Sequence, residues 1–139
     1  DNWHLYFNAG WQDIEVADSS LFVLENRPKG ALFPEYTANA GLSYLWSNGI
    51  RLSLDNQFND KRPASTSNVV AAETFYELDS YFDSTLTLQG NAKWFGNKTS
   101  VVKLQIHDLW GGKHSNPGFG GIDVPGLGLR YSLSFSQRF

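Results

Sequence analysis

The sequence contains no cysteine and no methionine, and it has no excess of basic residues. Without cysteine there is no disulfide framework and no thiolate metal site. Its 11 lysines and arginines face 14 aspartates and glutamates, giving a formal net charge of −3, whereas nucleic-acid-binding domains show a basic patch or stripe. The 139 residues also include no start methionine, and no charged-then-apolar leader opens them. We therefore expect that N-terminal polypeptide has been removed and that nucleic acid is not a partner.

Long apolar runs are missing as well. No stretch approaches the roughly 18 consecutive apolar residues of a membrane-spanning helix. The mean hydropathy is −0.35 and 41% of the residues are hydrophobic, but aromatic residues reach 15%. Strands of a transmembrane barrel alternate lipid-facing apolar and lumen-facing polar residues, so their mean hydropathy does not differ from that of a soluble protein. The missing run excludes a membrane helix and leaves a membrane barrel possible.

The clearest pattern is the final segment, residues 127–139, which reads LGLRYSLSFSQRF. Every second residue from Leu127 is apolar or aromatic, with Gln137 as the one exception, and the intervening residues are small, polar or charged. This period of two is typical of a strand whose two faces meet different environments. A membrane-spanning strand needs about 9–11 residues, longer than the usual globular strand of about five or six.

The same alternation recurs along the chain and predicts about six strands. Asn-Gly turn chemistry separates two of them at Ser47–Gly49. The predicted strands cover residues 2–12, 36–46, 50–58, 78–94, 102–107 and 127–139. Between them lie long loops at 13–35, 61–74 and 111–126 and short turns at 47–49 and 95–99.

Long and short connections therefore alternate strictly, as they do in outer-membrane barrels with short periplasmic turns and long extracellular loops. We predict an all-β fold, an antiparallel up-and-down transmembrane barrel segment in the outer membrane of a Gram-negative bacterium, with both termini periplasmic. Aromatic residues at the strand ends match the girdles that such barrels place at the two membrane interfaces. The predicted girdle residues are Trp3, Trp11, Tyr44, Trp46 and Trp94.

Six strands are fewer than the eight of the smallest standard barrels. An open sheet in a bilayer would leave two rows of unpaired backbone groups, each costing several kcal/mol. We therefore expect residues 1–139 to be the C-terminal part of a barrel that other strands complete, with no plug domain in this segment. Two alternatives stay open: a small self-contained barrel that acts as an adhesin or passive pore, and a soluble β-barrel or sandwich that binds an apolar ligand.

The order of these segments resembles the C-terminal end of TonB-dependent outer-membrane receptors. The resemblance rests on LYFNAGWQDIEV, the strand–turn–strand unit LSYLWSNGIRLSLDNQF, LDSYFDSTLTLQGNAKW, VVKLQIHDLWGGKH and the closing LGLRYSLSFSQRF. Asp108-Leu109-Trp110-Gly111 departs from the family's Asn-Leu-Phe-Asp. The resemblance implies a 22-stranded barrel with a plugged lumen. It also implies an assembly signal in the last strand, formed by Tyr131, Leu133, Phe135 and Phe139.

The same resemblance implies function and partners. Such a receptor imports a scarce small-molecule solute, for example an iron–siderophore complex. Its partners would be the remaining strands and the plug of the same receptor, TonB through the missing N-terminal part, the barrel-assembly machinery, and lipopolysaccharide or other lipid. No cofactor is implied.

The residues themselves indicate no catalytic or metal site. Asp79 and Asp83 would share a face about 13 Å apart, beyond the roughly 6.5–9.5 Å of an inverting carboxylate pair. We therefore do not predict an enzyme. Basic residues in the long loops could meet an anionic ligand or lipid phosphates, although solvated loop charge explains them more simply. These candidate ligand-facing residues are Arg27, Lys29, Arg62 and His114.

Overall fold

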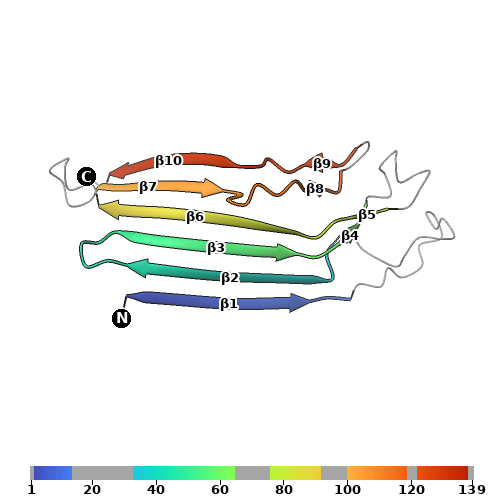
Figure 1. Cartoon of the computed structure of the whole chain (residues 1–139), viewed down its shortest axis with the longest axis horizontal. Coiled ribbons are helices and arrows are strands. Elements are labelled where there is room, and N and C mark those ends of the chain that lie inside the picture. The colour runs from blue at the N-terminus through green and yellow to red at the C-terminus, as the bar shows by residue number, and fades with distance from the viewer. Residues whose placement is uncertain (1, 14–32, 65–75, 92–99, 119–121, 138–139) are drawn as a thin grey trace.

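The chain forms one antiparallel sheet of six long strands. The computed structural model describes residues 2–13, 33–64, 76–91, 100–118 and 122–137. Neighbours in the sheet follow one another in the order β1-β2-β3-β6-β7-β10, as Figure 1 shows. The strands are β1 Trp3–Trp11, β2 Tyr36–Leu45, β3 Arg51–Asn59, β6 Tyr81–Asn91, β7 Ser100–His107 and β10 Arg130–Gln137. Within the described ranges, no helix has the length and apolarity needed to cross a membrane.

Two short ribbons, which the sequence did not predict, lie in the connections. The first ribbon pairs β4 (Arg62–Pro63) with β5 (Glu77–Leu78), and the second ribbon pairs β8 (Ser115–Asn116) with β9 (Val124–Pro125). Both ribbons lie at one end of the sheet, the loop end (Figure 1). The β2–β3 turn, the start of β1 and the finish of β10 lie at the opposite end, the turn end (Figure 1).

The predictions of an all-β fold and of about six antiparallel strands are confirmed, while the described strands form an open sheet with β1 and β10 at its edges. The largest differences from the predicted boundaries are at the starts of two strands. The strand predicted from Leu78 begins at Tyr81, because Leu78 pairs with Arg62 in the first ribbon. The strand predicted from Leu127 begins at Arg130, because Gly128 has φ 67°, which breaks an extended backbone. Residues 92–94 and 138–139 lie outside the described ranges.

Strand register brings the apolar positions of all six strands into continuous rows. Leu52 of β3 faces Tyr44 on one side and Leu88 on the other, so large apolar and aromatic residues meet along this row. Because side chains alternate across a strand, these rows share one face of the sheet. The two longest rows are Trp3–Tyr44–Leu52–Leu88–Leu104–Leu133 and Leu5–Leu42–Leu54–Leu86–Ile106–Tyr131. We call this side the apolar face.

No second layer of described residues covers the apolar face. In the described ranges, the buried hydrophobic side chains are Ala64 and Leu78, and neither belongs to a long strand. The chain exposes 10,312 Å², whereas a compact monomer of 15.6 kDa would expose about 7,250 Å². A single sheet without a covering layer contributes to this difference.

The opposite side, which we call the polar face, is held by side-chain hydrogen bonds between strands. Tyr6 donates to Asp55 at 2.9 Å across Gly41, where any Cβ would lie 2.1 Å from the tyrosine ring. Asn39 donates to Asn8 at 3.0 Å in the neighbouring row. Such cross-strand pairs stabilise a sheet that has no core of its own to pack against.

The turn between β2 and β3 confirms the predicted Asn-Gly signal. The amide of Gly49 donates to the Trp46 carbonyl at 2.9 Å, and the amide of Trp46 donates to the Ile50 carbonyl at 2.8 Å. Gly49 has φ 84°, the left-handed conformation that follows a type I turn in a hairpin. The short turn predicted at 95–99 lies outside the described residues.

Candidate functional site

The first candidate feature is the apolar face itself. Along β10, Leu133 is 74% exposed and Phe135 is 52% exposed, although both side chains are large and apolar. Tyr131, on the same face, is 69% exposed. An apolar area of this extent on a single sheet indicates a surface that contacts another apolar medium or molecule. The fourth residue of the predicted assembly signal, Phe139, lies outside the described ranges.

Aromatic side chains gather on this face at both ends of the sheet. At the turn end, Trp3 packs on Tyr44 with ring centroids 4.6 Å apart, and Tyr44 meets Trp46 edge-on at 4.9 Å. At the loop end, Trp11 is exposed and its Nε1 donates to a Glu35 carboxylate oxygen at 3.1 Å. Four of the five predicted girdle residues thus lie at the two strand ends, and Trp94 falls outside the described residues.

The second candidate feature is a cluster at the loop end, centred on Tyr81 at the start of β6. Arg62 is only 4% exposed, and its guanidinium lies 4.8 Å from the centre of the Tyr81 ring. Its Nη2 donates to the Ser115 carbonyl at 2.5 Å and to the Asn116 side-chain oxygen at 3.0 Å. Arg62 therefore ties the first ribbon to the second across more than 50 residues of sequence.

His114 packs against the same tyrosine. Its ring is stacked on Tyr81 with centroids 4.0 Å apart and an angle of 2° between the planes. A Cβ at Gly126 would lie 2.5 Å from two atoms of the imidazole, so only glycine lets the second ribbon approach the ring this closely. The Gly126 amide also donates to the His114 carbonyl at 2.8 Å, which holds the two segments together.

A second tie joins the connections that carry the two ribbons. The Tyr76 hydroxyl, just before β5, donates a hydrogen bond to the Asp123 carboxylate, just before β9. The hydrogen bond to Asp123 raises the pKa of Tyr76 to about 12, and burial and the negative charge of Asp123 act in the same direction. The hydroxyl therefore stays a donor throughout the physiological pH range.

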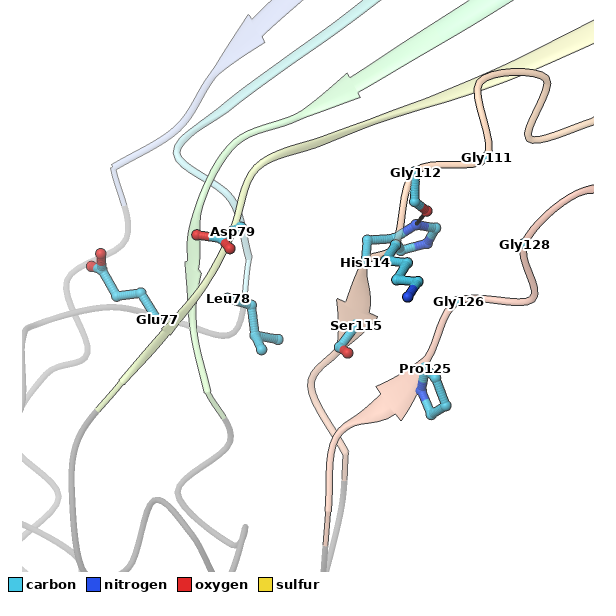
Figure 2. A pocket seen from close by; sticks show the side chains of 11 residues that line it. Glu77, Leu78, Asp79, Gly111, Gly112, His114, Ser115, Pro125, Gly126 and Gly128 are labelled. Atoms are coloured by element: carbon cyan, nitrogen blue, oxygen red, sulfur yellow. Dashed lines mark hydrogen bonds between the residues drawn. The ribbon is translucent and has the colours of Figure 1, made fainter.

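Between the ribbons lies a cleft of about 440 Å³. Figure 2 shows Leu78 pointing towards the second ribbon, while the carboxylates of Glu77 and Asp79 point away from it. The burial pattern agrees, since Leu78 is buried and its two neighbours are exposed. The cleft is lined by Glu77, Leu78, Asp79, Gly111, Gly112, Lys113, His114, Ser115, Pro125, Gly126 and Gly128.

Several polar atoms near this cluster are buried without a hydrogen-bond partner. They include Nη1 of Arg62, Nδ2 of Asn59 and Oδ1 of Asp83. Asn59 pairs with Tyr81 in the β3–β6 register, and Asp83 follows Tyr81 by two residues on the same side of β6. Among the described residues, Arg62 donates only to uncharged oxygens, so its buried charge has no carboxylate partner.

The structure brings two of the four predicted ligand-facing residues together. Arg62 and His114 both pack on Tyr81, but Arg62 is buried between the ribbons and does not project into solvent. Arg27 and Lys29 lie outside the described residues. Within the described part of the chain, no group of three or more histidine, cysteine, aspartate or glutamate residues could hold a metal ion.

Sequence reasoning missed Tyr81, Lys113, Asn116 and the Tyr76–Asp123 pair. The alternation of residues 78–94 places Tyr81 on the polar side of its strand, with Asp79 and Asp83, but nothing in the sequence indicates that Arg62 and His114 meet there. Polar residues within aperiodic loops carry no register, so their partners cannot be read from spacing.

No known family model matches the chain, and no curated protein sequence matches it. The described geometry and the sequence pattern therefore carry the functional argument.

Proposed function

We propose that this chain is the C-terminal segment of the transmembrane barrel of a TonB-dependent transporter in a bacterial outer membrane. The single observation that carries the proposal is the apolar face. Its two longest rows run unbroken across six strands, and their side chains are exposed or half-buried. Hydrocarbon is the medium in which such a face is stable while the opposite face meets water or a polar plug.

The open edges support a barrel completed by further strands. Outside their pairing with β2 and β7, β1 and β10 have no strand partner among the described residues. Each unpaired backbone group in hydrocarbon costs several kcal/mol, so a bilayer favours a closed barrel. The segment's work is then to close the barrel, to display the ribbons at the loop end and to carry the assembly signal of β10.

The whole transporter would import a scarce small-molecule solute, such as an iron chelate, using energy delivered by TonB. Deleting its gene should abolish uptake of one such solute, and loss of TonB should have the same effect. Uptake that continues without TonB would favour a passive pore. A heat-modifiable species of only 15.6 kDa on an unheated gel would favour a small self-contained barrel.

The lipid-facing assignment can be tested with spin labels, because residues 1–139 contain no cysteine and any cysteine elsewhere in the full-length protein can be replaced by serine. In the full-length protein in lipid vesicles, single cysteines would replace Leu133 and Ser132, which are adjacent in β10. A label at Leu133→Cys should collide mainly with oxygen dissolved in the bilayer, and one at Ser132→Cys mainly with a water-soluble nickel chelate. Equal accessibility of both labels to both agents would contradict the proposal.

The assembly signal offers a separate test. Phe139→Ala should lower the amount of folded receptor in the outer membrane severalfold, and Arg138→Ala should have little effect. Heat-modifiable receptor in membrane fractions measures the yield. Equal yields of the two variants would count against a terminal aromatic signal.

A further inference from the structure

The cleft between the two ribbons lies beside a positive charge that has no counter-ion among the described residues. Arg62 is buried, and its guanidinium meets two uncharged oxygens and the face of Tyr81. Its Nη1 has no hydrogen-bond partner in the described part of the chain. A buried charge is costly unless it is paired and hydrogen-bonded. The arrangement therefore favours an anion nearby.

The residues that line the cleft also favour an anion near Arg62. Lys113 and His114 line it, and His114 is held against Tyr81, the ring on which Arg62 also lies. The two acidic residues at the cleft, Glu77 and Asp79, direct their carboxylates away from the second ribbon (Figure 2). The side chain between them, Leu78, points towards the second ribbon, so it gives that wall an apolar contact.

Asp83 is the acidic residue nearest to Tyr81 along β6, and it could in principle neutralise Arg62. Its Oδ1 is buried without a partner, and no bond joins it to the guanidinium. The Asp123 carboxylate accepts from the Tyr76 hydroxyl. Neither acid supplies a hydrogen-bonded counter-ion for Arg62.

The remaining wall of the cleft is built from backbone. Four glycines line it, at positions 111, 112, 126 and 128, and Ser115 and Pro125 complete it. Glycine lets a bound group approach the main chain closely, and a volume of about 440 Å³ lies within the range of small-molecule sites.

We propose that this cleft binds a small solute through a carboxylate or similar oxyanionic group, which Lys113 and His114 contact and whose charge balances that of Arg62. The solute's apolar part would lie against Leu78 and Pro125. The inference rests on the proposed function for the solute's role as cargo. Binding itself requires neither TonB nor transport, so it can be tested separately.

The test uses the full-length protein in a non-ionic detergent, titrated calorimetrically with succinate as the probe. Dimethyl succinate, which has the same carbon chain without the charges, is the matched neutral compound. Succinate should bind and dimethyl succinate should not. Lys113→Gln should weaken succinate binding about tenfold, the loss expected for one charge-assisted hydrogen bond.

Lys61→Gln is the control variant, because it removes the same charge from an exposed lysine that does not line the cleft. Its affinity for succinate should be unchanged. Arg62→Lys retains the positive charge and should bind more tightly than Arg62→Gln, which distinguishes charge from a loss of folding. The proposal is overturned if native protein does not bind succinate, if Lys113→Gln binds it normally, or if Lys61→Gln weakens binding as much as Lys113→Gln does.

The outcomes also separate the two proposals. Spin labels that report lipid on β10 together with absent succinate binding would reject the cleft and keep the barrel. Succinate binding in a protein whose labels report no lipid contact would do the reverse.

Discussion

The sheet and its loop end are stabilised in different ways. In the sheet, each long strand pairs with the long strands that come before and after it along the chain. The turn at 46–49 joins β2 to β3 directly. At the loop end, two short ribbons are joined by Arg62 and by the Tyr76–Asp123 pair, contacts between residues about 50 positions apart. The sheet therefore depends on a repeated local pattern, whereas the loop end depends on a few individual side chains. Mutations should expose this difference directly.

The largest effect is expected in the middle of the apolar face. Leu54→Lys places a charge in the row that joins Leu42 to Leu86 and should destabilise the folded receptor in lipid by about 2–4 kcal/mol. Ser53→Lys, one residue away on the polar face, should change stability little. Urea unfolding in vesicles measures both, and a similar loss in the two variants would show that the faces are not in different media.

A smaller and local effect is expected at the ribbons. Arg62→Met keeps much of the side chain's bulk but removes its hydrogen bonds to Ser115 and Asn116, a loss of about 1.5–3 kcal/mol for a charged donor. Hydrogen exchange should accelerate in β8 and β9 and stay unchanged in β2 and β3. Lys61→Met, at the exposed neighbouring position, is the matched control. Uniform acceleration across the sheet would contradict a local tie.

A substitution at Asp108, the residue that follows β7, should stabilise the folded protein. Asp108 has φ 52°, is 2% exposed, and neither carboxylate oxygen has a hydrogen-bond partner among the residues that the structure describes. Asn tolerates this backbone conformation and carries no charge, so Asp108→Asn should stabilise the protein by about 1 kcal/mol. Asp108→Ala should gain less, because alanine is strained at positive φ. A lower urea midpoint for Asp108→Asn would indicate a partner for this carboxylate in the assembled receptor.

The smallest effect concerns the Tyr76–Asp123 tie. The folded pKa of Tyr76, about 12, exceeds the ordinary tyrosine value near 10. The tie therefore contributes fully below pH 10 and is lost as the pH rises through about 12. The tyrosinate absorbance of Tyr76 is the part of the signal that Tyr76→Phe lacks. It should titrate near pH 12 in native protein and nearer pH 10 in Asp123→Asn. Titration near pH 10 in the native protein would show that this hydrogen bond does not form.

Much of the sheet could be predicted because its signal is local. The alternation of Trp3, Leu5 and Phe7 requires no knowledge of the neighbouring strand, and Asn48-Gly49 defines a turn by its own backbone preference. Boundaries were less predictable. Leu78 fits the alternation of β6 as well as it fits the first ribbon, and only its pairing with Arg62 separates the two.

The amino-acid sequence by itself determined the strands, their two faces and the tight turn, because side-chain alternation and glycine conformation act within a few residues. Only the tertiary structure decided that Arg62 and His114 meet on Tyr81 and that a cleft lies between the ribbons. Those contacts depend on where distant loops come together, and loop closure imposes no periodic pattern on the residues that it joins.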